Sequence, residues 1–184
     1  CTMVSSSSQV LKWNIGADPA TLDPGLNGAS DGGDVINQTF EGLTREINGV
    51  VYPGIAESWA TSNEGKTITF TLRASNWSDG TPLTASDFVY SWLRGMDPLT
   101  ASEYSWIWEY TNITGSLAAV YDGGSLDDVA IEATDDYTLV VGLDYPTYLP
   151  LGQLILAIIL GLVFDKIYPL SFIFKEASLV LGII

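Results

Sequence analysis

Two aspartates, Asp79 and Asp87, lie near two tryptophans in the segment 76–92, which reads NWSDGTPLTASDFVYSW. A pair of carboxylates performs the acid–base chemistry of glycoside hydrolases, and aromatic rings beside such a pair would form a sugar-binding surface. That chemistry requires a second carboxylate at a defined distance from the first. The sequence shows no such partner for Asp79, and the residues around both aspartates favour a structural role.

These surrounding residues carry the signals of a turn followed by a helix. The run 78–82 combines aspartate, glycine and proline, which is typical of a turn. Thr84, with Asp87 three positions later, fits a helix N-cap and an acid that faces the positive end of the helix. We therefore predict that Asp87 stabilises a helix rather than acting in catalysis. The positions that follow form one apolar stripe: Phe88, Val89, Trp92, Leu93 and Met96.

The composition excludes several classes of active site. The chain has no histidine, which removes serine–histidine and cysteine–histidine catalysis together with histidine zinc sites. Its one cysteine, Cys1, leaves no internal disulfide. The net charge of −15 argues against nucleic acid as a partner, because phosphate binding depends on clusters of lysine and arginine. The sequence has no calcium-loop or phosphate-loop motif, and nothing in it demands a cofactor.

The acidic charge is confined to the first 150 residues. Residues 1–150 hold 20 acidic and 5 basic side chains, whereas the two acids and two bases of residues 151–184 cancel. This shift predicts a boundary near Pro150. The tail contains an apolar run at 154–164, which is shorter than the ~20 residues needed to cross a membrane. We favour a buried helix or a shifted reading frame over a transmembrane anchor.

The leader resembles the start of a mature bacterial lipoprotein. Cys1 precedes a run of four serines within residues 1–9. We expect lipid on the Cys1 thiol and a flexible tether over 1–9. The lipid would attach the protein to the membrane, at the extracellular face of the cytoplasmic membrane or in the periplasm. The alternative is an arbitrary chain start.

Two stretches alternate between apolar and polar side chains, as half-buried strands do. Residues 66–73 place threonines opposite apolar residues, and we pair this strand with 56–61 through a turn at 63–65. A further strand is expected over 137–143, behind a turn at 135–136.

Other segments favour helices or irregular structure. An apolar stripe from Val35 to Leu43 predicts a helix that ends near Gly42. Residues 10–15 are expected to form a short strand, and the aromatic run 102–112 a helix or an irregular segment. Strands and helices without a steady repeat favour an α/β fold with α+β character.

Several sequence blocks occur here in one order: FEGLTR, YPGIAESWATSNEGKTITFTLR, NWSDGTPLTASDFVYSWLRGMDPLTAS and ATDDYTLVVGLDYP, with LDP at 22–24 ahead of them. Over residues 10–148 the chain resembles the extracellular solute-binding proteins of peptide ABC transporters, the oligopeptide- and dipeptide-binding family 5. The resemblance implies a periplasmic-binding-protein type II-like fold with two lobes that close on a peptide.

The resemblance also implies a division of the chain. Residues 10–40 correspond to the start of the first lobe, and 41–150 to the extra subdomain of peptide binders. The second lobe has no counterpart, so we expect an N-terminal portion only. The role of the tail, 151–184, stays open.

In the family, main-chain groups hold part of the peptide backbone, much as a neighbouring strand would. Aligned from the flanking blocks, that strip falls on Gly28, Ala29 and Ser30. The best-studied branch has an acidic residue facing the ligand at the place of Gly28, so that contact is absent here. Tyr104 takes the place of a tyrosine that lines the pocket in that branch; ordinary packing is the alternative.

The resemblance implies capture rather than catalysis. The expected role is the substrate-binding component of a peptide ABC importer, with peptides and the permease subunits as partners. Two alternatives remain: a carbohydrate-binding or glycoside hydrolase module, favoured by 6 tryptophans and 9 tyrosines, and a structural surface fragment that binds no small ligand. Without a second lobe, we expect residues 1–184 alone to bind peptide weakly or not at all.

Overall fold

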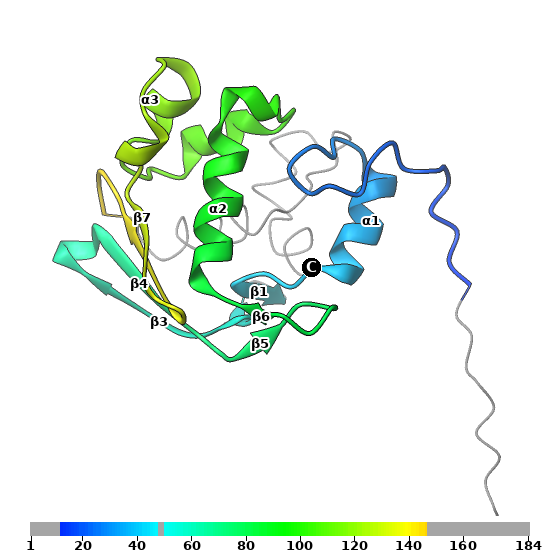
Figure 1. Cartoon of the computed structure of the whole chain (residues 1–184), viewed down its shortest axis with the longest axis horizontal. Coiled ribbons are helices and arrows are strands. Elements are labelled where there is room, and N and C mark those ends of the chain that lie inside the picture. The colour runs from blue at the N-terminus through cyan, green and yellow to red at the C-terminus, as the bar shows by residue number, and fades with distance from the viewer. Residues whose placement is uncertain (1–11, 48–49, 147–184) are drawn as a thin grey trace, which may run out of the picture.

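The computed structural model describes residues 12–47 and 50–146 (Figure 1). The predictions for Cys1, the tether and the tail after Pro150 lie outside these residues. The helices are α1 (Ser30–Thr39), α2 (Ala85–Met96) and α3 (Ser116–Tyr121), with short 3-10 segments η1 (Asn63–Gly65), η2 (Pro98–Thr100), η3 (Ser105–Tyr110) and η4 (Leu126–Asp128). The strands are β1 (Thr44–Ile47), β2 (Val50–Pro53), β3 (Ala56–Ser62), β4 (Thr67–Leu72), β5 (Ser75–Asn76), β6 (Pro82–Leu83), β7 (Ile131–Asp135) and β8 (Thr138–Gly142).

An antiparallel sheet with the strand order β3-β4-β8-β7 forms the main layer. The alternation predicted for 66–73 is confirmed, since Ile68, Phe70 and Leu72 of β4 are all buried. Phe70 lies opposite Leu139 of β8, and Ile68 lies opposite Val141. These directly facing pairs are the units that stabilise a sheet, so β4 and β8 form its apolar centre.

The two sheet hairpins turn close to the expected places. Between β3 and β4, Asn63, Glu64 and Gly65 all have positive φ angles of 51°, 55° and 85°, which confirms the predicted turn. Between β7 and β8 the turn lies one residue later than predicted: Asp135 ends β7, and its side chain accepts a hydrogen bond from the Tyr137 N–H at 2.8 Å. Tyr137 therefore belongs to the turn, and strand β8 begins after it.

Helix α2 is held by its cap and by a tryptophan pair. Thr84 and Asp87 form a capping box, in which the Asp87 carboxylate accepts the Thr84 N–H at 2.7 Å. This confirms the structural role predicted for Asp87. On the buried face, the Trp92 ring lies 6.5 Å from that of Trp108, whose indole N–H donates to the Gly95 carbonyl at 3.0 Å. Residue Trp108 thus attaches η3 to α2.

The helix expected from Val35 to Leu43 begins earlier and ends earlier than its apolar stripe. Helix α1 ends at Thr39, whose hydroxyl donates to the Val35 carbonyl, and Phe40 is already extended with φ −111° and ψ 147°. Leu43 is fully buried, but as part of the run into β1. The apolar stripe therefore predicts a helix end that lies too late in the sequence. Its buried residues belong to two successive elements, α1 and the segment that leads into β1.

The strand predicted at 10–15 is wrong for its described part. Residues 12–15 form no strand, and Trp13 is 54% exposed. A strand needs a neighbour for its N–H and C=O groups. Within the described residues, no strand pairs with this stretch.

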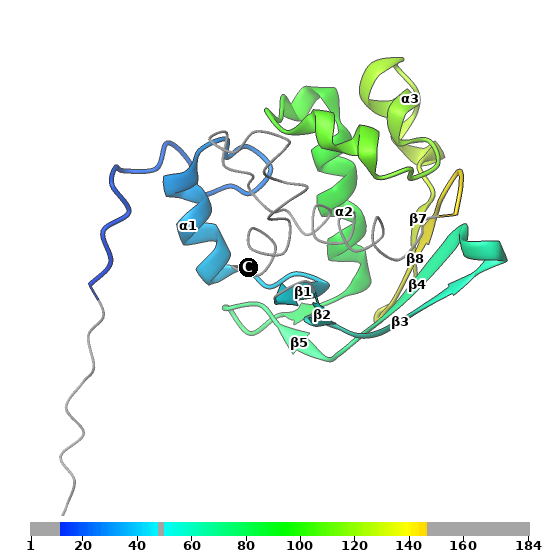
Figure 2. The same ribbon diagram turned by 180° about the vertical axis from the view of Figure 1, so that it is seen from behind.

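Helix α2 lies between the four-stranded sheet and α1, as the two opposite views agree (Figures 1 and 2). It packs on β7 and β8, with η3 and α3 beside it. One hydrophobic cluster joins these elements, and every buried member lies between Leu43 and Leu143. We call this cluster the subdomain core. Helix α1 stands outside it.

Candidate functional site

The predicted peptide strip, Gly28–Ser30, forms the end of the loop that enters α1. Ala29 is extended, with φ −131° and ψ 153°. Among the described residues, neither the N–H nor the C=O of Gly28 makes a hydrogen bond. The Ala29 carbonyl is occupied, because it accepts the Gly33 N–H at 3.0 Å and the Asn27 side-chain amide at 2.8 Å. Gly28 therefore provides the open backbone of the strip.

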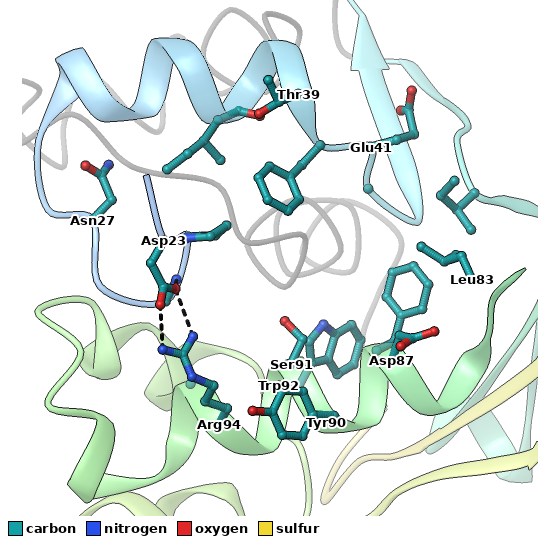
Figure 3. A pocket seen from close by; sticks show the side chains of 18 of the residues that line it. Asp23, Asn27, Thr39, Glu41, Leu83, Asp87, Tyr90, Ser91, Trp92 and Arg94 are labelled. Carbon is teal, nitrogen blue, oxygen red and sulfur yellow. Dashed lines mark hydrogen bonds and ion pairs between the residues drawn. The ribbon is translucent and has the colours of Figure 1, made fainter. Parts of the chain in front are cut away.

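An ion pair attaches the loop before this strip to α2. The Arg94 guanidinium donates two hydrogen bonds to the Asp23 carboxylate, at 2.8 and 2.6 Å (Figure 3). The same carboxylate accepts the Gly25 N–H, while the Asp23 carbonyl accepts the N–H groups of Leu26 and Asn27. The bond from Arg94 lowers the pKa of Asp23 below its ordinary value. This bidentate pair sets the position of the loop relative to α2.

Asn27 fixes the loop against α1. Its side chain is buried, with 3% of the residue exposed, and it lies against Gly32 in the first turn of the helix. A Cβ at Gly32 would lie 2.8 Å from the Asn27 Cγ and 2.9 Å from the Thr21 carbonyl oxygen. Glycine is therefore required for this close approach, which the sequence pattern did not reveal.

Tyr104, the other predicted ligand residue, directly precedes η3. It is half-buried, packs against the subdomain core, and its ring lies 6.0 Å from that of Trp106. Trp106 in turn makes an edge-on contact with Tyr110 at 6.0 Å. Trp108 is buried against Trp92. Packing is therefore observed for Tyr104, and its contact with a ligand stays a prediction.

The structure brings the two parts of the predicted site together through Glu103. A Cβ at Gly28 would lie 2.9 Å from the Cδ of Glu103 and 3.5 Å from its Cβ. The exposed Glu103 side chain therefore fills the space beside Gly28 that a side chain there would occupy. Sequence reasoning missed Glu103; its position next to Tyr104 was the available signal.

A cavity of about 820 Å³ separates α1 from α2 (Figure 3). Ile36 and Phe40 line it from α1 and its end, and Phe88 and Trp92 from α2. Asn27 and Tyr104 reach it next to the strip. Its polar contributors include Asp23 and Arg94, which already bond to each other. Asn37, Ser91 and Ser102 add further polar groups, so the lining is mixed.

The two aspartates of segment 76–92 serve local structure. The Asp79 carboxylate accepts the Thr81 N–H at 2.9 Å and the Thr81 hydroxyl at 2.7 Å, and these bonds lower its pKa. A general acid of a glycoside hydrolase needs the opposite shift. Asp87 is engaged in the helix cap. No group of three or more metal-ligating residues occurs in the described part of the chain.

No helix within residues 12–47 and 50–146 has the length and apolar character required to cross a bilayer.

Comparison with known proteins defines the class. Residues 50–176 match the family model for bacterial extracellular solute-binding proteins, family 5, middle region. The matched range continues past Pro150, the boundary predicted from the charge shift. The fold and the match to this family model both indicate that the chain is part of a solute-binding protein. The chain belongs to family 5 of the bacterial extracellular solute-binding proteins.

Relatives by sequence carry oligopeptide-binding names. The chain is 46% identical over 145 residues to the oligopeptide-binding protein OppA of Bacillus subtilis, covering 78% of this chain and 26% of that protein. It is 39% identical over 143 residues to the periplasmic oligopeptide-binding protein OppA of Escherichia coli, covering 77% and 26%. A relative that is 39% identical over 140 residues, E. coli YgiS, is named a probable deoxycholate-binding periplasmic protein; the match covers 75% and 26%. The chain thus spans about a quarter of the length of these curated relatives.

Solved structures share the fold. OppA of Haemophilus influenzae in complex with the peptide RPPGFSPFR aligns with a TM-score of 0.72 and 32% identity, covering 91% of this chain and 32% of that chain. The unliganded open form of the murein tripeptide-binding protein MppA aligns with a TM-score of 0.71 and 35% identity, covering 88% and 32%. The expected periplasmic-binding-protein fold is therefore confirmed for this part of the molecule.

Proposed function

We propose that this chain is part of the substrate-binding component of a peptide ABC importer, which captures oligopeptides outside the cell and delivers them to the permease subunits. The observation that carries the proposal is the open backbone of Gly28, next to the extended Ala29, among the described residues. The names of the sequence relatives support it.

The strip would recognise what all peptides share. Backbone N–H and C=O groups at Gly28 would pair with the ligand main chain as in an added strand, which provides affinity without reading side chains. The Tyr104 ring would pack on the ligand beside that strip. The mechanism is capture: closure of two lobes buries the peptide, and the closed form docks on the permease. It includes no catalytic step.

The location follows the same proposal. Relatives named periplasmic support a place outside the cytoplasm. The lipid expected on Cys1 would hold the protein at the membrane. Intact mass of the protein from its source cells tests this, since lipid adds a defined mass to the peptide that contains Cys1, and an unmodified cysteine would contradict it.

Calorimetry with the whole protein from its source cells tests the ligand class. A mixed peptide pool, an oligosaccharide pool and deoxycholate are titrated separately, the last because of the relative named for that compound. We expect heat from the peptide pool only. Binding of oligosaccharide alone would favour the carbohydrate module, and no binding at all would favour a structural surface fragment.

Tyr104 supplies a matched pair of variants. Tyr104→Ala should weaken peptide binding by about tenfold, as loss of one aromatic contact does. Tyr137→Ala, in the exposed β7–β8 turn, should leave it unchanged. Equal affinities for the two variants would remove Tyr104 from the site. Residues 1–184 alone should bind weakly or not at all, and micromolar binding by them would contradict that expectation.

A further inference from the structure

Large apolar side chains are exposed on η3 and on α3, which stands at the edge of the molecule in both views (Figures 1 and 2). The rings of Trp106 and Tyr110 on η3 meet edge-on at 6.0 Å. The Tyr121 hydroxyl on α3 donates to the Glu109 carboxylate on η3 at 2.7 Å. Leu117 lies four positions before Tyr121, on the same side of α3. These five side chains therefore form one continuous surface, which we call the α3 face.

The α3 face lies in a part of the chain that has no basic residue. No lysine or arginine occurs between Arg94 and Lys166. Exposed aspartates adjoin the helix instead. Asp122 follows α3 directly, and Asp127 and Asp128 lie in η4, which packs on α3. An aromatic and apolar centre is thus bordered by negative charge.

This arrangement has the composition of a protein interface. Tyrosine and tryptophan are enriched in the centre of such interfaces, and charged groups lie at the rim. The charge restricts the partner. A second copy of the chain would bring acids against acids, and an anionic membrane surface would be repelled in the same way. A protein surface that combines lysine or arginine with apolar side chains is complementary to the α3 face.

We propose that the α3 face docks on the permease subunits of the importer, through a basic surface of those subunits. This rests on the proposed function, which assigns delivery of the peptide to the permease. The α3 face borders the proposed ligand contact, since the ring of Trp106 lies 6.0 Å from that of Tyr104. Tests of docking therefore use Tyr110 and Leu117, and peptide affinity is measured beside permease affinity in every variant.

The experiment uses the whole protein, loaded with peptide, and the peptide permease complex of the source cells, purified in detergent and immobilised. Dissociation constants for the permease are measured at two ionic strengths. Calorimetry with the mixed peptide pool gives the peptide affinity of each variant, and the melting temperature shows that it is folded.

We expect Tyr110→Ala and Leu117→Ala each to weaken binding to the permease by about tenfold, as truncation of a central interface side chain does. Peptide affinity should stay within about twofold of the parent value. The control Tyr52→Ala removes another exposed ring, on β2, and should leave both affinities unchanged.

The acidic rim is tested by the double variant Asp127→Asn, Asp128→Asn. Rim charges act mainly on the association rate, so we expect slower association and a weaker dependence of binding on ionic strength than in the parent. The control Glu57→Gln, Glu64→Gln removes two exposed acids on β3 and in the turn after it. Because β3 is the sheet edge opposite β7, this control should bind as the parent does.

Parent-like permease binding by Tyr110→Ala and by the double aspartate variant overturns this inference. So does a parent protein that binds peptide without binding the permease, although capture of peptides then still stands. Trilysine provides a further arm. If these variants weaken trilysine binding and leave permease binding unchanged, the α3 face is a site for free cationic peptides and the inference is wrong. Absence of peptide binding in the parent overturns the proposed function itself.

Discussion

Residues 12–40 and the subdomain from Leu43 to Leu143 are built differently. The subdomain has a four-stranded sheet, two helices and a shared hydrophobic core. The N-terminal segment has one helix, whose buried Ile36 lies outside that core, and it faces α2 across a cavity. Its loop is attached to α2 by the Asp23–Arg94 ion pair. One region is held by apolar burial, the other largely by polar contacts and close backbone packing.

Because of this difference, the residues that stabilise the fold lie mainly in the subdomain, whereas the proposed peptide strip lies in the N-terminal segment. The conspicuous sequence blocks lie mainly in the subdomain, where they specify strands, turns and a capped helix. The strip at Gly28–Ser30 lies in the N-terminal segment, and the Glu103 side chain of the subdomain lies beside its Gly28. Segments with few buried apolar contacts open at lower free energy than core strands do. The predictions below test whether the two regions respond independently.

The largest effect is expected from Phe70→Ala, at the centre of the sheet. Phe70 is 1% exposed, and such truncations cost about 3–5 kcal/mol of the free energy of unfolding. Urea unfolding followed by circular dichroism measures it. The control Leu99→Ala, at a residue that is 93% exposed, should change stability by less than about 0.5 kcal/mol. A loss below about 1 kcal/mol for Phe70→Ala would contradict the position of this residue in the core.

Gly32→Ala should act on the N-terminal segment. The added methyl group would meet the Asn27 side chain and the Thr21 carbonyl, and such overpacking costs about 1–3 kcal/mol. Hydrogen exchange should show faster exchange of α1 amides and unchanged exchange in β4 and β8. Ser30→Ala, on the exposed start of the same helix, is the control. Equal acceleration in the sheet would show that the two regions unfold as one unit.

A smaller loss is expected from Thr84→Ala, which removes the cap of α2. Loss of an N-cap hydroxyl costs about 1 kcal/mol, and Thr84→Ser should restore most of it. Urea unfolding detects the change across the whole subdomain, because α2 packs on β7 and β8. If serine and alanine have the same effect, the hydroxyl is not what stabilises the helix.

The smallest effect is expected from Asp23→Asn, and it depends on pH. Arg94 lowers the pKa of Asp23 in the folded protein, so the folded state favours the ionised carboxylate. Its contribution is full above the ordinary aspartate value of about 3.9, and it disappears as pH falls through the lowered pKa. Both side chains of the pair are 33% exposed, so screening by solvent limits the loss to about 1 kcal/mol or less.

Hydrogen exchange of the loop around Asn27, in the wild type and in Asp23→Asn, measures that effect. The two proteins should differ at pH 7 and converge at strongly acidic pH. Glu41→Gln, which removes the other ion pair in the described residues, with Arg45, is the matched control and should not affect the loop. A difference between Asp23→Asn and wild type that grows towards acidic pH would contradict the sign of the shift.

Much of the subdomain could be predicted because its signals are local. Threonine alternation identified β4, the residues at 63–65 identified its turn, and Thr84 with Asp87 identified the start of α2. Strand β7 was missed, since its alternation is short and rests on only two apolar residues, Ile131 and Ala133. The helix expected up to Leu43 was overextended, because apolar residues of α1 and of the following loop share one stripe by coincidence.

The candidate site was predicted only in part. The resemblance to peptide-binding proteins indicated Gly28–Ser30 and Tyr104, and these remain proposals for the ligand contacts. The position of the Glu103 side chain beside Gly28 could not be found that way. Nor could the pairing of Asp23 with Arg94, which lie 71 positions apart. The division at residue 40 stays a prediction, supported by a core that contains no residue before Leu43.

The sequence by itself determined the turns, the helix cap and the faces of the central strands, because these follow from backbone geometry over a few consecutive residues. It also determined family membership, since long blocks agree in order. Only the tertiary structure decided which distant side chains meet. The Glu103 carboxylate lies at Gly28 because the Asp23–Arg94 pair and the Trp108–Gly95 hydrogen bond hold two separate loops at the same C-terminal end of α2. No local sequence pattern encodes that meeting.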